Sequence, residues 1–174
     1  MSQNNKDENA WPLVTIIMPV RNEAAFIGRS LAALLEQTYP KERIEIVIAD
    51  GMSTDSTRTI IEEFKNGSDV LIALVDNPGK IAPSGLNRAI AEAKGDVIVR
   101  VDGHCEIAAD YVANCVALLQ SGRADGIGGP SQTVGVTLPA RAIASDRRRP
   151  TGEGGTECRT IKASGREGET GRLT

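Results

Sequence analysis

The stretch Val97–Cys105, VIVRVDGHC, decides the fold that we predict for this chain. It is a short apolar run, rich in β-branched residues, that ends in an acid. Such a run is typical of a buried parallel strand. Strands of this kind place ligand chemistry just beyond their carboxyl ends. We therefore expect Asp102 and His104 to stand together on the loop that leaves the strand, close enough to share one cation.

The same pattern occurs along much of the chain, where short apolar runs alternate with amphipathic segments. The expected strands are 13–20, 44–50, 70–75, 97–102 and 124–129. The expected helices are 23–37, 53–66, 84–94 and 110–121. Apolar strands that alternate with amphipathic helices predict an α/β fold, with a mostly parallel sheet flanked by helices on both faces.

The length, composition and net charge of the chain fit one ordinary domain and exclude several classes of protein. The chain has 174 residues, 40% of them hydrophobic, which is enough for a buried core. A net charge of −3 argues against broad nucleic-acid binding. Cys105, Cys115 and Cys158 fit no metal or disulfide spacing, which favours a reducing compartment. No signal peptide or membrane span is evident, so we expect the cytoplasm, including the inner face of the membrane.

Polar residues gather where the predicted strands end. They are Arg21, Asn22 and Glu23 after the first strand, Asp50 at the end of the second, Asp76 and Asn77 after the third, and Asp102 and His104 after the fourth. In a parallel sheet all of them emerge at one edge, where they suit a metal–nucleotide or a sugar. For any single residue, the capping of a helix or turn is the competing explanation. The motifs of dinucleotide-binding oxidoreductases and of P-loop enzymes are absent from the sequence.

Four stretches carry a resemblance to a known family. They are VTIIMPVRNE (14–23), IEIVIADGMSTDST (44–57), NPGKIAPSGLNRAIAEAKGDVIVRVDGH (77–104) and GIGGP (126–130). In these stretches the chain resembles the family 2 glycosyltransferases, whose GT-A fold is a Rossmann-like nucleotide-binding domain. The VRVDGH and NPGKIAPSGLN segments look most like the bacterial exopolysaccharide glycosyltransferases of the succinoglycan type.

The resemblance implies transfer of a hexose from a nucleotide-diphosphate sugar, commonly UDP-linked, with inversion at the anomeric carbon. The acceptor would be a polysaccharide or a lipid-linked glycan in exopolysaccharide synthesis. The resemblance places Pro19, Arg21 and Glu23 in the loop that holds the nucleoside, Asp50 against the base, and Asn87 beside the nucleotide pocket. Asp102 and His104 match the D-x-D motif that holds ribose, diphosphate and a divalent cation.

The charges of the site agree with this chemistry. A divalent cation, Mn²⁺ or Mg²⁺, would neutralise the diphosphate as it leaves. An imidazole ligand at His104 favours Mn²⁺, because imidazole suits softer cations. Lys80 would assist in binding the diphosphate, and Arg100 would do the same unless it only pairs with a nearby acid.

Four departures from the family pattern put specific roles in doubt. Gly51 follows Asp50 where a second acid is frequent, Leu86 stands where an arginine is common, and His104 replaces the second acid of D-x-D. The general base of the family is an aspartate in a later segment, and nothing after residue 139 resembles that segment. No catalytic residue can therefore be assigned, and the chain is expected to be truncated.

The composition changes near residue 145, and we divide the chain accordingly. We expect a disordered N-terminus at 1–10, the donor-binding half of a glycosyltransferase at 11–140, and a non-homologous, disordered tail at 141–174. The tail has 8 basic and 5 acidic residues, whereas the rest has 12 basic and 18 acidic. Its few apolar residues cannot offset the entropy of ordering it. Either the tail is natural, or a frameshift produced it, which is the explanation that we favour.

Three hypotheses follow from the sequence. The first is an active glycosyltransferase. The second is a truncated, non-catalytic nucleotide-binding module. The third is a fragment that does not fold alone, because its missing half leaves a sheet edge or an apolar face uncovered.

Overall fold

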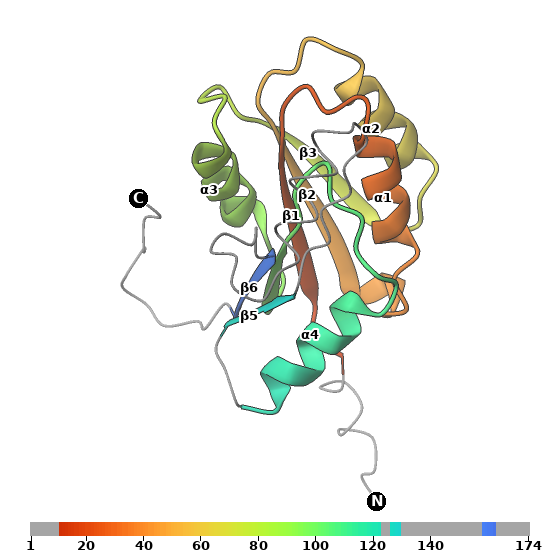
Figure 1. The fold of residues 1–174 in the computed structure, drawn as a ribbon, viewed down its shortest axis with the longest axis vertical. Coiled ribbons are helices and arrows are strands. Elements are labelled where there is room, and N and C mark those ends of the chain that lie inside the picture. Colours follow the sequence, from red (N-terminus) through yellow and green to blue (C-terminus); the bar gives the residue numbers. More distant parts are fainter. Residues whose placement is uncertain (1–10, 123–125, 130–157, 163–174) are drawn as a thin grey trace, which may run out of the picture.

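The structure, a computed structural model, describes residues 11–122, 126–129 and 158–162 as one sheet with helices packed against it (Figure 1). The strands are β1 (Val14–Val20), β2 (Ile44–Asp50), β3 (Leu71–Asp76), β4 (Val97–Arg100), β5 (Gly126–Gly129) and β6 (Cys158–Lys162). The helices are α1 (Ile27–Leu35), α2 (Thr57–Asn66), α3 (Ala82–Glu92) and α4 (Tyr111–Gln120), with a short 3₁₀ turn, η1 (Lys41–Arg43). The α/β fold with a parallel core is confirmed.

The sheet has six strands in the order β3-β2-β1-β4-β6-β5. β1 pairs in parallel with both β2 and β4, and β2 pairs in parallel with β3. The register aligns Val20 with Asp50 and Asp50 with Asp76. The first three strands therefore end in one row, and the loops that follow them leave the sheet together.

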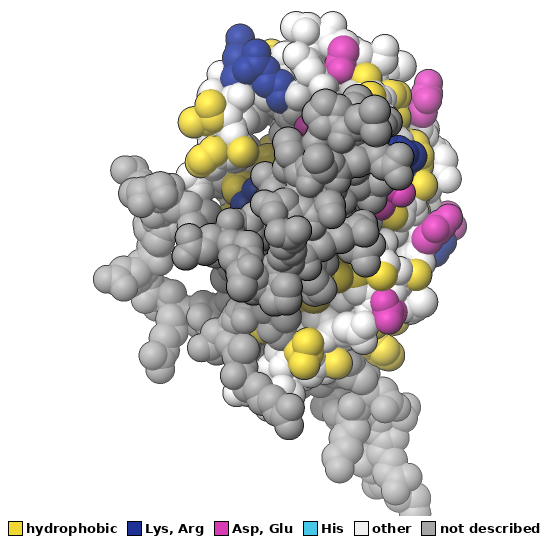
Figure 2. Space-filling view, viewed as in Figure 1, with side chains coloured by type: hydrophobic (Ala, Val, Ile, Leu, Met, Phe, Trp, Pro, Cys, Tyr) yellow, Lys and Arg dark blue, Asp and Glu magenta, His cyan; other side chains and the backbone are white. Residues whose placement is uncertain are grey.

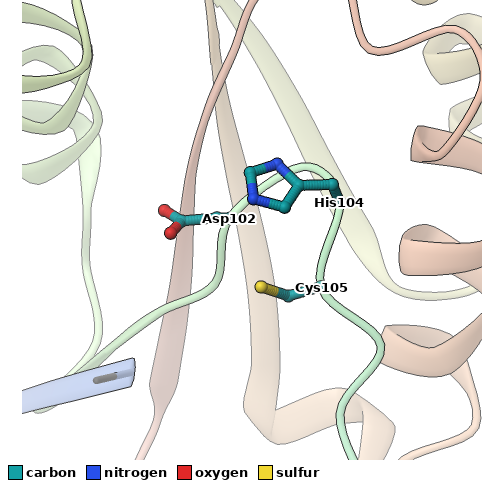
Figure 3. Close-up of side chains that lie close together, drawn as sticks. All are labelled: Asp102, His104 and Cys105. Atoms are coloured by element: carbon teal, nitrogen blue, oxygen red, sulfur yellow. The ribbon is translucent and has the colours of Figure 1, made fainter. Parts of the chain in front are cut away.

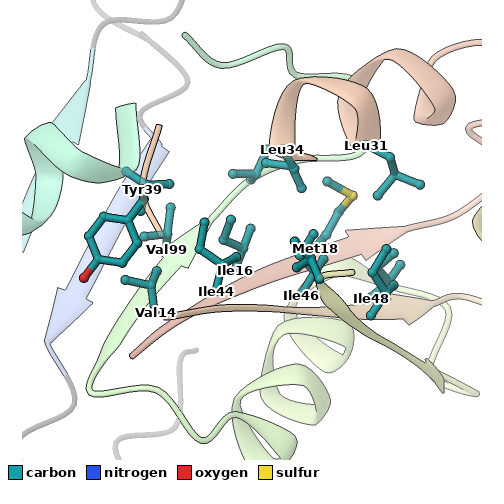
Figure 4. Close-up of a cluster of buried hydrophobic side chains, with 14 of the residues drawn as sticks. Val14, Ile16, Met18, Leu31, Leu34, Tyr39, Ile44, Ile46, Ile48 and Val99 are labelled. Carbon is teal, nitrogen blue, oxygen red and sulfur yellow. The ribbon is translucent and has the colours of Figure 1, made fainter. Parts of the chain in front are cut away.

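Side chains alternate between the two faces of the sheet, and each face has its own helices. The larger core is formed by α1, α2 and α4 with one set of strand residues, including Ile16, Met18, Ile46, Ile48 and Val99 (Figure 4). The smaller core packs Leu86 and Ala89 of α3 against the alternate set, which includes Ile17 and Val47. Figure 1 shows α1 and α2 on one side of the parallel strands and α3 on the other. Because both faces are covered, the central strands are mostly apolar, as the sequence predicted. The polar residues within β1 and β2, which are Thr15, Glu45 and Asp50, are themselves buried.

Two helices, α1 and α2, begin later than the sequence predicted, because the loop before each has its own hydrogen bonds, whereas α3 begins earlier than predicted, at Ala82. α1 was expected from residue 23, but it begins at Ile27. Asn22 has a φ of 54°, and its side-chain oxygen accepts a hydrogen bond from the Thr54 N–H at 2.9 Å. α2 begins at Thr57, whose N–H donates to Asp55 Oδ1 at 3.0 Å. The loop before α1 also uses Glu23 and Ala24, whose N–H groups donate to Thr57 Oγ1 at 2.8 Å and to Asp55 Oδ2 at 3.1 Å. Both loops thus use residues that we had assigned to a helix.

Two short strands extend the sheet beyond β4. β6 pairs antiparallel with β4, and β5 pairs antiparallel with β6. β5 matches the predicted fifth strand, whereas β6 lies within the segment 141–174 that we expected to be a disordered tail. The structure describes residues 158–162 as a strand, and the division of the chain into a donor-binding half and a tail stays a prediction. An unpaired edge of β4 is a template for a further strand, and the β-branched Thr160 and Ile161 suit one.

The other residues of the tail and the N-terminal segment 1–10 lie outside the described residues, so the structure does not test those predictions. Within the described part of the chain, no helix is long and apolar enough to cross a lipid bilayer.

Tyr39 anchors the amino-terminal edge of the sheet. Its side chain is buried, and its hydroxyl donates a hydrogen bond to the Pro12 carbonyl at 2.6 Å. The Trp11 ring packs edge-on against the Tyr39 ring, with 5.1 Å between the ring centroids. Burial raises the pKa of Tyr39 to about 12, although the positive charge of Arg43 opposes that shift. The fold therefore favours the neutral phenol.

We predict that Tyr39 makes the protein sensitive to alkaline pH. Its pKa in the folded state lies above the ordinary value of 10.0, so its stabilising effect is complete below pH 10. That effect is lost as the pH rises towards about 12. Urea unfolding from pH 7 to 12 should show this loss in the wild type and in Tyr111→Phe, but not in Tyr39→Phe. Equal pH dependence of all three proteins would contradict the prediction. At neutral pH, Tyr39→Phe should lower the free energy of unfolding by about 1 kcal/mol.

Candidate functional site

A cleft of about 260 Å³ opens at the edge where the parallel strands end. Its walls come from the loops after β1, β3 and β4. The lining residues are Pro19, Val20, Arg21, Glu23, Asn77, Lys80, Ile81, Ala82, Arg100, Asp102 and His104. Figure 2 shows the face of the molecule seen in Figure 1, with basic side chains grouped near the upper left and acidic ones along the upper and right edges. Among its lining residues, the cleft combines three positively charged side chains with two carboxylates and one histidine: Arg21, Lys80 and Arg100 with Glu23, Asp102 and His104.

The structure brings most of the predicted site residues together. Pro19, Arg21, Glu23, Lys80, Asp102 and His104 all line the cleft. Asp50 does not, because its side chain is fully buried beneath the loops. Asn87 does not either, since it lies on the exposed side of α3. The predicted contacts of Asp50 with a base and of Asn87 with a nucleotide remain predictions.

Three loops at this edge contain residues with unusual backbone angles. Among the described residues, the positive φ values outside glycine belong to Asn22 (54°), Met52 (58°) and Lys80 (59°). They follow β1, β2 and β3 respectively. Such conformations persist only where the surroundings impose them, and they cluster at functional sites. The three loops therefore have defined shapes before any ligand binds.

Asn77 holds the loop that presents Lys80. We expected it at this edge of the sheet, but we assigned it no specific role from the sequence. It is buried, its amide nitrogen donates to the Ile81 carbonyl at 3.0 Å, and its amide oxygen accepts from Ser84 Oγ at 2.8 Å. Its backbone carbonyl accepts from the Lys80 N–H at 3.0 Å. The only sequence signal was its position after the third strand, because burial cannot be read from one polar residue.

Gly51 leaves space for Arg21, which gives a physical reason for one departure from the family pattern. A Cβ atom at position 51 would lie 3.1 Å from Arg21 Cβ and 3.2 Å from its Cδ. The Arg21 guanidinium reaches the Lys80 carbonyl, with 3.4 Å between Nη1 and the oxygen. A second acid at position 51 would crowd the arginine, so the glycine and Arg21 fit together.

Asp50 is held by donors of the protein itself. Its carboxylate accepts hydrogen bonds from Ser53 Oγ at 2.5 Å and from the Ser53 N–H at 3.0 Å. Arg58 Nη1 lies 2.8 Å from Asp50 Oδ2 and 2.8 Å from Asp76 Oδ1. The hydrogen bonds to Asp50 and Asp76 raise the pKa of Arg58 above its ordinary value. Arg58 therefore ties together the ends of β2 and β3.

The two predicted cation ligands also have partners in the structure. Arg100 Nη2 lies 3.0 Å from Asp102 Oδ1, so the arginine both pairs with the acid and lines the cleft. His104 Nδ1 lies 3.1 Å from Glu23 Oε1. Burial lowers the pKa of His104, but the hydrogen bond and charge of Glu23 outweigh it, so the pKa is above the ordinary value.

The donor atoms at the end of β4 fit a divalent cation. One ligand atom each from Asp102, His104 and Cys105 lies within 4.8 Å of the others (Figure 3). Carboxylate oxygen suits Mg²⁺ and Mn²⁺, and imidazole nitrogen suits softer cations. The thiol of Cys105 was not among the predicted ligands, because its spacing from the other cysteines indicated no metal site.

The sequence model of the family described as "Glycosyl transferase family 2" matches residues 15–166. The match extends past residue 140, so it includes part of the segment 141–174 that we expected to be a tail. The succinoglycan biosynthesis protein ExoA of Rhizobium meliloti (strain 1021) is 35% identical over 158 residues, which cover 90% of this chain and 47% of that protein. Glycosyltransferase AglE of Haloferax volcanii is 30% identical over 136 residues, covering 78% of this chain and 44% of that protein. The chain spans about half the length of these relatives.

Solved structures share the fold. The mannosyltransferase PcManGT from Pyrobaculum calidifontis, in complex with GDP-Man and Mn²⁺, is 31% identical with a TM-score of 0.64 over 69% of this chain and 36% of that one. Glucosyl-3-phosphoglycerate synthase from Mycobacterium tuberculosis, in complex with Mn²⁺, UDP and glucosyl-3-phosphoglycerate, is 17% identical with a TM-score of 0.59. That match covers 88% of this chain and 57% of the synthase. At that identity the second likeness shows the fold alone.

We predict that Arg58→Met destabilises the protein by about 1–3 kcal/mol, because Asp50 stays buried and loses a charged hydrogen-bond donor. Arg88→Met, at an exposed arginine of α3, is the matched control and should change stability by less than about 0.5 kcal/mol. The free energies of unfolding in urea measure both effects. Equal stability of the two variants would show that Arg58 does not hold the strand ends together.

Proposed function

The chain belongs to glycosyl transferase family 2 and has the GT-A type of fold, and from this premise we propose that it binds a nucleotide-diphosphate sugar in the cleft. The observation that carries the proposal is the charge pattern of the cleft. Arg21, Lys80 and Arg100 supply positive charge, and Asp102 and His104 stand among them as candidate cation ligands. A diphosphate that carries a divalent cation complements both halves of this pattern.

We assign the donor-binding roles to the residues as they lie in the cleft. Asp102 and His104 would hold a divalent cation, which neutralises the negative charge that develops on the diphosphate when the sugar leaves. Lys80 is held at the cleft by the loop that Asn77 fixes, and it would contact a phosphate oxygen directly. Arg100 already pairs with Asp102, so it orients this carboxylate and adds positive charge beside it.

We further propose that the donor is a UDP-linked hexose and that the acceptor is a polysaccharide or a lipid-linked glycan in exopolysaccharide synthesis. The similarity to the succinoglycan biosynthesis protein supports this acceptor class. The mannosyltransferase relative was solved with GDP-Man, so guanine is the competing base. We keep the cytoplasm, with the inner face of the membrane, as the predicted location.

A non-catalytic nucleotide-binding module is the second candidate, and one observation favours it. An inverting transfer needs a base within hydrogen-bond reach of the acceptor hydroxyl. The carboxylates that line the cleft are Glu23 and Asp102, and they are engaged by His104 and Arg100 respectively. In the part of the chain that the structure describes, we therefore assign no residue the role of base.

We predict that UDP binds with the help of Mn²⁺ and that Asp102→Asn weakens this binding at least about tenfold, because the variant loses a charged cation ligand. Asp69→Asn is the matched control, since Asp69 is exposed and precedes β3 at the opposite edge of the sheet. Calorimetric titration with UDP and GDP, each with and without Mn²⁺, measures the affinities. Equal binding by both variants would contradict the assignment of Asp102.

A transfer assay with UDP-hexoses and glycan acceptors separates the two candidate functions. Product formation that needs both donor and acceptor supports the transferase. Metal-dependent nucleotide binding without turnover supports the binding module. A cooperatively folded chain that binds neither nucleotide would contradict both.

A further inference from the structure

A sulfur atom lies among the candidate cation ligands. Asp102, His104 and Cys105 come from one tight turn, which is closed by a hydrogen bond from the Cys105 N–H to the Asp102 carbonyl at 2.9 Å. The ligand atoms of the three side chains lie within 4.8 Å of one another. Figure 3 shows the Cys105 thiol and the His104 imidazole approaching from the same stretch of loop.

We propose that Cys105 Sγ is a third protein ligand of the cation held by Asp102 and His104, and that it gives the site a preference for a borderline cation such as Zn²⁺ or Co²⁺ over Mg²⁺. An oxygen, a nitrogen and a sulfur donor together suit these metals, whereas Mg²⁺ selects oxygen ligands. This inference deepens the proposed function, on which it rests for the role of the cation at the diphosphate.

The distances are compatible with such a site. Zinc lies about 2.3 Å from sulfur and about 2.0–2.2 Å from nitrogen or oxygen. Neighbouring ligands in a tetrahedron are therefore about 3.3–3.6 Å apart. The three atoms lie within 4.8 Å of one another, so rotations of the side chains would have to bring them about 1 Å closer for all three to bind one cation. Three protein ligands leave the fourth position open, as in zinc sites that act on a substrate.

The partners of the ligands also favour cation binding. Glu23 Oε1 lies 3.1 Å from His104 Nδ1, so Nε2 is the nitrogen that remains for the metal. A carboxylate on the second ring nitrogen is the usual support of a metal-binding histidine. Arg100 contacts the Asp102 carboxylate, but each carboxylate oxygen has a second lone pair with which to bind a cation. On binding, the Cys105 thiol would release its proton to solvent, and the thiolate would donate to the metal.

Cobalt spectroscopy on the full chain tests the proposal without nucleotide or acceptor. Co²⁺ bound by a thiolate gives a sulfur-to-metal charge-transfer band in the near ultraviolet. We expect this band in the wild type and its loss in both Cys105→Ser and Cys105→Ala. Cys115→Ser and Cys158→Ser are the matched controls and should keep the band, since Cys115 is buried in α4 and Cys158 belongs to β6.

Competition experiments with Zn²⁺ measure how much affinity for the cation is lost when Cys105 is replaced. The loss of an outer partner of a metal ligand costs about 10–100-fold in affinity. The loss of a ligand should therefore weaken Zn²⁺ binding at least about tenfold in Cys105→Ser, with Mg²⁺ binding unchanged. Circular dichroism of each variant establishes that it is folded.

The outcomes separate this inference from the proposed function. Absence of the band in the wild type, with or without UDP, would overturn the inference, as would a band that survives in folded Cys105→Ser. If either result is found while UDP still binds with Mn²⁺, the proposed donor site is supported and only the assignment of Cys105 as a ligand is rejected. A band that depends on Cys105 in a chain that binds no nucleotide would support the sulfur ligand and reject the donor site.

Discussion

The parallel register of β1 with its neighbours is the constraint on which the site depends. It aligns Val20, Asp50 and Asp76 in one row, so the loops after the first three strands leave the sheet at one level. Backbone bonds continue this ladder past the strand ends. The Gly51 N–H donates to the Val20 carbonyl at 2.8 Å, and the Asn77 N–H donates to the Asp50 carbonyl at 2.8 Å. Residues far apart in the sequence are therefore brought to one cleft by the backbone.

Charge compensation is the second feature of this edge. Arg58 ties the ends of β2 and β3, Arg100 pairs with Asp102, and His104 pairs with Glu23. A nucleotide diphosphate alone would place negative charge beside Asp102, and a cation alone would place positive charge beside Arg100. The two charges cancel when both ligands bind, so we expect the binding of one to strengthen that of the other.

The sequence predicted the parts of the structure that depend on local patterns. The apolar runs located the parallel strands, and the place of Asp102 and His104 after a strand located the cleft. What the sequence did not predict depends on tertiary contacts. The packing of Arg21 over Gly51, the burial of Asn77 and the approach of the Cys105 thiol to His104 involve residues whose types are common in any loop. Strand β6 was missed because its segment is poor in apolar residues, and the edge of β4 that it pairs with is not visible from its own sequence.

A crystal structure of the chain with UDP and Mn²⁺, with the manganese located by its anomalous scattering, tests the central claim most directly. The account predicts a manganese peak at bonding distance from Asp102 and His104, and a diphosphate between that peak and the side chains of Arg21, Lys80 and Arg100. A manganese ion bound to other acids, or a nucleotide bound away from the ends of the parallel strands, would contradict it.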